Sequence, residues 1–398
     1  MTLSMKIEGI LSERVTASEQ SSTVRIADMA KKLKEKGNAV YDFSAGRAFE
    51  HTPEYVMEGA IAAMRAGDTH QTMAQGTTLY REACATKLHR ENGITANPET
   101  DIVATMGCKQ GLTVSLLAIL NPGDEVIVED PCFVSYKQII RYLGGNPVDV
   151  PLLPENKFRW KREQLEAAIT EKTKAIIMCT PHNPTGVVHS IEDLGEVAYV
   201  AKKYNLYVIT DEPYERMVWG GRQHLNLASL PGMRERTITL MSLTKSFSMG
   251  GWRIGFAHAE PHFIEQMTKL QQHLITCVSS FVQAGGAIAF GQNPHDEVQK
   301  CWAEWEKKVT FFTQSLNEIN GIKCYTPEGG FYGWVDISEL NIPSEKFCDQ
   351  LLEREKVALV PGVSFGKHGE NYVRVTCVKS WEEINNGLEG IRSFVQNL

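Results

Sequence analysis

The chain has 398 residues, which is enough for more than one domain, since a typical domain has about 100–150 residues. Hydrophobic residues make up 42% and charged residues 22%, the composition of a globular protein that buries its own core. The formal net charge of −7, without a dense run of Lys and Arg, argues against a surface for nucleic acid or anionic membranes.

Targeting and membrane segments are not indicated. The first 15 residues contain no apolar core of the kind that a signal peptide needs. No apolar run approaches the ~18 residues of a membrane span. The nine cysteines include no CxxC pair, which argues against a zinc ribbon or a disulfide framework. We therefore expect reduced thiols and a cytoplasmic protein without nucleic-acid or membrane partners.

Short apolar runs alternate with helix-like stretches through the middle of the chain. The runs expected to form strands are residues 102–106, 125–128, 175–178, 206–210, 237–241 and 253–257. The stretches expected to be helical are residues 110–120, residues 191–203 and a segment that begins at Tyr214. This alternation is typical of an α/β sheet with mostly parallel strands.

Both ends of the chain have a different pattern. Helices are expected over residues 22–36, 304–317 and 344–355 and at the C-terminal end, with strands over residues 333–337, 357–360 and 372–377. Strands grouped with helices are typical of an α+β layer. We therefore expect a large domain at residues 48–290 and a smaller domain built from residues 1–47 and 291–398.

Residues able to do chemistry follow the predicted strands. Ligands of open α/β sheets bind just beyond the carboxyl ends of the strands. The residues at these ends are Gly107, Cys108, Lys109, Asn183, Asp211, Tyr214, Ser242, Thr244, Lys245 and Arg253. We therefore expect them to meet at one edge of the sheet.

Each of these signals also has an ordinary explanation. Lys245 is either a solvated surface lysine or a buried amine able to form a Schiff base. Asp211 either caps a helix or holds a buried cation. Cys108 opens a helix whose free N–H groups could bind an anion, and Arg253 either binds phosphate or lies on the surface. Together they match pyridoxal 5′-phosphate, which needs a lysine, an acid for its pyridine nitrogen, donors for its phenolate oxygen and a phosphate clamp.

The order and spacing of these segments resemble the class I aminotransferases, which are fold-type-I pyridoxal-phosphate enzymes. The resemblance is greatest to the bacterial aspartate/prephenate aminotransferase branch. The segments that carry it are residues 182–186 (HNPTG), 211–214 (DEPY), 242–247 (SLTKSF) and 251–255 (GWRIG). The similarity runs from residues 11–15 to residues 372–375, nearly the whole chain. It implies a large domain with a mostly parallel seven-stranded sheet, pyridoxal 5′-phosphate as cofactor, and a homodimer with shared active sites.

The resemblance implies three catalytic residues. Lys245 would form the Schiff base with the cofactor and move the substrate proton. Asp211 would keep the pyridine nitrogen protonated, so that the ring remains an electron sink. Tyr214 would donate to the phenolate oxygen together with Asn183.

The resemblance also assigns the other contacts. The phosphate would be held by the backbone of Cys108 and Lys109 and by Ser242, Thr244 and Arg253. Phe133 would stack on the ring, and Gln71 stands where the family has a tyrosine that reaches the phosphate of the neighbouring subunit. The substrate α-carboxylate would be bound by Arg374, Asn183 and the backbone at Gly46.

The residue at position 109 is informative about substrate specificity. In the aspartate/prephenate branch, a lysine at this position points toward a side-chain carboxylate, which favours aspartate or glutamate as amino donor. The alternative is a lysine that only faces solvent. The segment that follows Gly46, residues 47–53, departs from the family pattern near the substrate.

We expect an aminotransferase that moves an amino group between an L-amino acid and a 2-oxo acid by a ping-pong mechanism. The same residues would also support another pyridoxal-phosphate reaction, namely β- or γ-elimination or oxidation by oxygen, because fold does not fix function. No metal site is expected. His258 and His262 are four residues apart, but Pro261 is expected to prevent a regular helix there.

Overall fold

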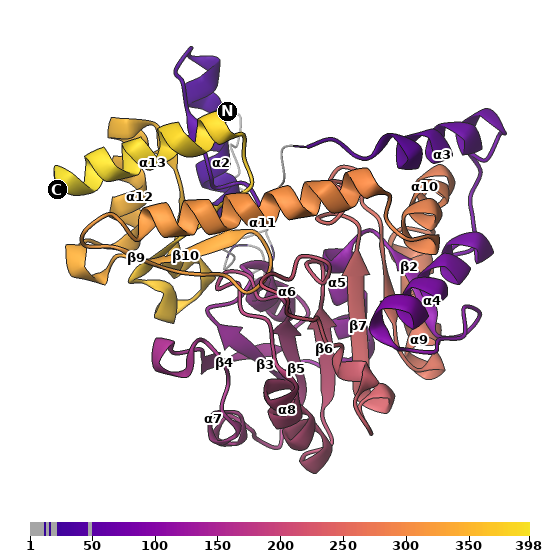
Figure 1. The fold of residues 1–398 in the computed structure, drawn as a ribbon. Coiled ribbons are helices and arrows are strands. Elements are labelled where there is room, and N and C mark those ends of the chain that lie inside the picture. The colour runs from indigo at the N-terminus through magenta and orange to yellow at the C-terminus, as the bar shows by residue number, and fades with distance from the viewer. Residues whose placement is uncertain (1–11, 13–15, 17–21, 47–49) are drawn as a thin grey trace, which may run out of the picture.

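A seven-stranded sheet forms the centre of the larger part of the molecule in the computed structural model, which describes residues 12, 16, 22–46 and 50–398 (Figure 1). The strands are β2 (Ile102–Thr105), β3 (Glu125–Asp130), β4 (Asn146–Pro151), β5 (Thr173–Cys179), β6 (Tyr207–Asp211), β7 (Thr237–Ser242) and β8 (Gly255–His258). Their order is β2-β8-β7-β6-β5-β3-β4. Strand β8 is antiparallel to both of its neighbours, β2 and β7, and the other pairs are parallel, so the predicted mostly parallel sheet is confirmed.

The six expected strands lie in this sheet because their apolar side chains are covered on both faces. All six residues of β7 are buried, as strands of a parallel sheet between helices must be. Strand β4 was not expected, because its sequence NPVDVP contains two prolines. This strand lies at the edge of the sheet, where proline is tolerated because part of the backbone needs no ladder partner.

The helices of this larger part are α3 (Glu54–Arg65), α4 (Thr78–Asn92), α5 (Cys108–Ile119), α6 (Ser135–Tyr142), α7 (Arg162–Ala167), α8 (Ile191–Lys203), α9 (Pro261–Leu274) and α10 (Ser280–Gly291). Helix α3 packs on α10. The helix expected over residues 191–203 is confirmed, and the Ser190 hydroxyl caps it by accepting a hydrogen bond from the N–H of Asp193.

The prediction of a helix from Tyr214 onward is wrong. The segment forms a turn, and Val218 makes an isolated bridge with Gly329. The Trp219 N–H donates to the carbonyl of Glu328 at 2.8 Å, and the Met217 carbonyl accepts from Gly330 at 2.8 Å. The backbone therefore pairs with a distant segment instead of with its own next turn.

The smaller sheets come from the two chain ends. A four-stranded antiparallel sheet has the order β12-β13-β10-β9, and a parallel pair joins β1 to β11. The strands are β1 (Tyr41–Asp42), β9 (Lys323–Tyr325), β10 (Tyr332–Asp336), β11 (Val357–Ala358), β12 (Val360–Pro361) and β13 (Tyr372–Thr376). The helices beside them are α2 (Ser22–Glu35), α11 (Asp296–Leu316), α12 (Ser344–Glu355) and α13 (Trp381–Gln396).

A long helix and side-chain contacts join the larger part of the molecule to the smaller sheets. Helix α11 runs from the region of α10 to the smaller sheet (Figure 1). Its Phe312 ring stacks on Phe43, which follows β1, with ring centroids 5.2 Å apart. His368 and Asp130, at the carboxyl end of β3, form a hydrogen bond of 2.7 Å. The carboxyl edge of the large sheet therefore faces the smaller sheet.

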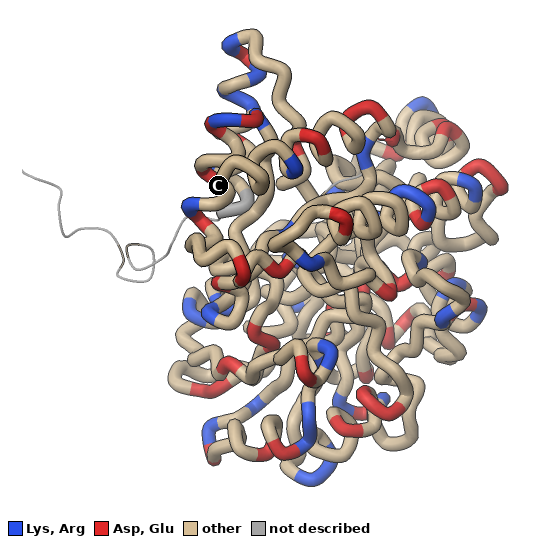
Figure 2. The backbone as a smooth tube through the Cα atoms, turned by 60° about the vertical axis from the view of Figure 1, so that its left-hand side comes forward, with Lys and Arg blue, Asp and Glu red and all other residues tan. Residues whose placement is uncertain are grey.

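Acidic and basic residues are interspersed along the backbone in the view of Figure 2. Within the described residues, every helix is too short or too polar to cross a membrane.

Candidate active site

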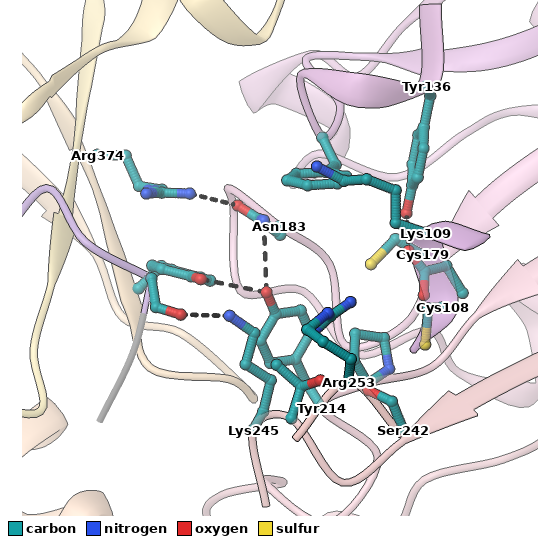
Figure 3. A pocket seen from close by; sticks show the side chains of 16 residues that line it. Cys108, Lys109, Tyr136, Cys179, Asn183, Tyr214, Ser242, Lys245, Arg253 and Arg374 are labelled. Carbon is teal, nitrogen blue, oxygen red and sulfur yellow. Dashed lines mark hydrogen bonds between the residues drawn. The ribbon is translucent and has the colours of Figure 1, made fainter. Parts of the chain in front are cut away.

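A cavity of about 470 Å³ lies beyond the carboxyl ends of β2, β5, β6 and β7 (Figure 3). It is lined by Gly46, Cys108, Lys109, Phe133, Tyr136, Cys179, Asn183, Asp211, Pro213, Tyr214, Ser242, Thr244, Lys245, Arg253, Tyr332 and Arg374. The structure thus brings together the predicted site residues except Gln71, which is exposed and outside the cavity, and Gly107, which does not line it but lies next to Arg253.

Four lining residues were not predicted: Tyr136, Cys179, Pro213 and Tyr332. Pro213 lies inside the DEPY segment and Tyr136 is three residues after Phe133, so both stood next to predicted residues. Cys179 is the last residue of β5 and is found by asking what ends each strand. Tyr332 comes from the smaller sheet, and no local pattern in the sequence marked it.

Asp211 is the last residue of β6, and only one of its two carboxylate oxygens accepts a hydrogen bond of normal geometry within the described part of the chain. The hydroxyl of Tyr136 donates to Oδ2 at 2.6 Å. The other oxygen, Oδ1, is buried and makes no hydrogen bond of normal geometry with the described residues. Burial raises the pKa of Asp211, although the Tyr136 hydroxyl and the Cys108 thiol oppose the shift. A ring N–H placed at Oδ1 would satisfy this oxygen and favour the ionised form.

The start of α5 offers a cradle for an anion. Gly107 precedes the helix with a φ of +76°, and a Cβ there would lie 2.6 Å from Nη2 of Arg253. The first N–H groups of a helix have no partner inside it, so those of Cys108 and Lys109 face the cavity end of α5. Arg253 donates to the Met106 carbonyl at 2.8 Å and thereby lies beside them. Backbone donors and a guanidinium together suit a phosphate.

Lys245 lies three residues beyond the end of β7. Its ammonium donates to the backbone carbonyl of Gly46, so it bridges the large sheet and the segment after β1. The nitrogen is 5.8 Å from the ring centroid of Tyr214 and 5.7 Å from that of Phe331. A primary amine is therefore held among aromatic rings inside the cavity.

Arg374 reaches the same cavity from β13 and is buried (Figure 3). Its Nη1 donates to Oδ1 of Asn183 at 3.1 Å and its Nη2 to the carbonyl of Ser44 at 2.9 Å. Neither contact is with a carboxylate, and Nε is buried without a hydrogen-bond partner among the described residues. Burial lowers the pKa of Arg374. A bound carboxylate would supply the missing charge and the missing acceptor.

The lining residues carry an excess of positive charge. Lys109, Lys245, Arg253 and Arg374 face one carboxylate, that of Asp211. The Lys109 ammonium lies 5.4 Å from the ring centroid of Phe133. Partial burial and the charges of Arg253 and Lys245 lower the pKa of Lys109. Such a cavity favours ligands with several negative charges.

The expectation that no regular helix carries both His258 and His262 is confirmed. Helix α9 begins only at Pro261, the first helical position, where proline is well tolerated because its missing N–H has no partner to lose. His258 belongs to β8 and His262 to α9, so the two histidines do not lie on one helix.

Three potential metal ligands, Glu212, Glu215 and His224, do approach one another elsewhere. The buried ammonium of Lys87 contacts Glu215, and His224 and Asn226 both bond to Glu212 at 2.8 Å. The ammonium of Lys87 therefore already pairs with one member of this cluster, Glu215.

The comparisons with known proteins agree with the geometry. Residues 38–391 match the family described as aminotransferase class I and II. The chain is 35% identical to the aspartate aminotransferase of Musicola paradisiaca, over 97% of this chain and 96% of that protein. It is equally 35% identical to aromatic-amino-acid aminotransferase 2 of Thermococcus litoralis, over 97% and 98%.

Solved structures show the same relationship. Aspartate aminotransferase from Thermus thermophilus with maleate superposes with a TM-score of 0.90, at 33% identity, over 96% of this chain and 99% of that chain. The chain therefore belongs to the class I and II aminotransferases, pyridoxal-phosphate-dependent enzymes that transfer an amino group between an amino acid and a 2-oxo acid.

Proposed function

We propose that this aminotransferase takes aspartate or glutamate as its amino donor. The observation that carries the proposal is the cationic cavity, which Lys109 lines together with the buried Arg374, so that two cations are available for a substrate with two carboxylates. Aspartate aminotransferases among the relatives support it. The named relatives are aminotransferases, so the elimination and oxidation reactions considered from the sequence are not favoured.

The residues of the cavity fit pyridoxal 5′-phosphate, whose ring acts as an electron sink when bound. Asp211 would hold a proton at the pyridine nitrogen through its unpaired Oδ1. Asn183 and Tyr214 would donate to the phenolic oxygen, and Phe133 would lie against the ring. The phosphate would be gripped by the backbone of Cys108 and Lys109 and by Ser242, Thr244 and Arg253.

The substrate contacts follow from the same arrangement. Arg374 would bind the α-carboxylate as a two-pronged donor, with Asn183 and the backbone at Gly46 on either side. Lys245 would carry the cofactor and would then move a proton from the substrate Cα through its Nζ. Its contact with the Gly46 carbonyl keeps this amine beside the place where the α-carboxylate would lie.

Replacing the proposed base gives the first test. Lys245→Ala is expected to lower kcat by about 10³-fold or more, because no other amine replaces its chemistry. The chain should keep its circular dichroism spectrum. Lys307→Ala, which removes an exposed lysine of α11, is the matched control and should have wild-type turnover. Full activity of Lys245→Ala would contradict the assignment.

A substitution of Lys109 tests the proposed preference for an acidic amino donor. Lys109→Met keeps the apolar stem against Phe133 but removes the charge. We expect kcat/KM for aspartate and glutamate to fall by roughly ten- to hundredfold, the equivalent of one charge-assisted hydrogen bond. Steady-state assays with alanine as donor should show little change. Equal losses for acidic and neutral donors would exclude Lys109 as the specificity residue.

We also propose a homodimer whose partner completes each active site. Gln71 is exposed and outside its own cavity, which is consistent with a contact to a partner subunit. Apolar side chains nearby in the chain, Met64, Met73 and Leu79, are 41%, 59% and 61% exposed. A subunit interface would cover them.

Sedimentation at assay concentration tests the dimer. The expected mass is twice the 44.5 kDa of one chain, and dilution below the dissociation constant should reduce specific activity. A monomer with full activity would contradict the shared site.

Two further expectations are kept as proposals. We propose the domain division at residues 48–290 and 291–398, with residues 1–47 in the smaller domain. The start of that segment and its end at Arg47 lie outside the described residues. We also propose a cytoplasmic location, because all nine cysteines are unpaired, as thiols are in a reducing compartment.

A further inference from the structure

Tyr332 is a lining residue to which the proposed function gives no role. It begins β10 and is only 2% exposed. Its hydroxyl lies 3.1 Å from the hydroxyl of Tyr214. The guanidinium of Arg374 lies over its ring, 4.2 Å from the centroid. A methyl group at Gly46 would overlap the Tyr332 hydroxyl and would be 3.5 Å from Nζ of Lys245, so all three groups meet at this glycine.

The neighbours of Tyr214 fix the direction of its hydrogen bonds. Arg374 can only donate, so its bond of 3.1 Å identifies the Asn183 atom that faces it as the carbonyl oxygen. The NH₂ group of Asn183 must then face Tyr214, and it donates to the Tyr214 oxygen at 3.4 Å. Tyr214 has one lone pair and one proton left for Tyr332 and for a ligand.

The two phenols are not equivalent as donors. Burial tends to raise the pKa of Tyr332, but the positive charges of Lys245 and Arg374 bring it below the ordinary value. Burial and the neighbouring Tyr332 raise the pKa of Tyr214. The guanidinium of Arg374 over the Tyr332 ring draws electron density from that phenol and makes it the better donor, so charge favours a bond in which the Tyr332 O–H points to the Tyr214 oxygen.

We propose that Tyr332 is a positioning residue that donates to the oxygen of Tyr214 and so leaves the Tyr214 proton for the phenolic oxygen of the cofactor. With both the Asn183 amide and Tyr332 donating to it, the Tyr214 oxygen has its lone pairs filled and its own proton directed into the cavity. Tyr332 thus acts on the cofactor only through Tyr214. The inference rests on the proposed role of Tyr214.

The test is the pH dependence of the visible absorption band of the protein loaded with pyridoxal 5′-phosphate. Donors to the phenolic oxygen stabilise its anionic form and lower the pH midpoint. Tyr332→Phe keeps the ring under Arg374 and removes only the hydroxyl. We expect its midpoint to rise by about 0.4–1 pH unit, the size of one net hydrogen bond. Tyr214→Phe should raise the midpoint by at least as much.

The double variant separates the proposal from other roles of Tyr332. Because Tyr332 acts through Tyr214, adding Tyr332→Phe to Tyr214→Phe should cause no further shift. Tyr325→Phe removes a phenol from the same sheet outside the cavity and should leave the midpoint unchanged.

Other outcomes of these measurements would contradict either the role of Tyr332 or that of Tyr214. An unchanged midpoint in Tyr332→Phe, beside a raised midpoint in Tyr214→Phe, would refute the role of Tyr332 alone. A full further shift in the double variant would show that Tyr332 acts directly or through Lys245, against the proposal. Loss of cofactor binding in Tyr332→Phe would also contradict it, because the contacts to Asp211 and to the phosphate cradle remain. An unchanged midpoint in Tyr214→Phe would instead refute the proposed function of Tyr214.

Discussion

The Asp211 carboxylate, buried at the end of a central strand, is the constraint on which the chemistry of the cavity depends. A buried charge needs partners, and Tyr136 satisfies only one of its two oxygens. The cationic side chains around it need anionic partners in turn. A ligand with a ring N–H, a phosphate and a phenolic oxygen meets both needs. The fit to pyridoxal 5′-phosphate therefore rests on the unpaired oxygen of Asp211 and the excess of cations in the cavity, in addition to the sequence similarity to known aminotransferases.

The active site exists because two parts of the chain meet. The large sheet supplies the acid, the amine and the anion cradle from the ends of its strands. The smaller sheet supplies Arg374 and Tyr332, and the segment after β1 supplies Ser44 and Gly46. The Lys245–Gly46 contact and the Arg374–Asn183 bond both cross this boundary. Movement of one part against the other would therefore change the substrate site before it changed the phosphate cradle.

The large sheet was predictable because its strands are short apolar runs, each followed by polar residues. Lys245, Asp211 and Asn183 could be placed together because parallel strands end at one edge. The β4 strand could not be predicted, since its prolines are tolerated only at an edge position that the sequence does not reveal. The turn at Tyr214 depends on bonds to Glu328 and Gly330, and Tyr332 enters the cavity through pairing of β10 with β13. Such long-range partners leave no local pattern.

The most direct measurement is the visible spectrum of the purified, cofactor-loaded protein while amino acids are added one at a time, beginning with aspartate and glutamate. The account predicts that an acidic amino acid bleaches the visible band and that a 2-oxo acid restores it. A neutral amino acid should do so only at much higher concentration. A protein with no visible band even after pyridoxal 5′-phosphate is added would contradict the central claim, as would release of ammonia without a reversible change.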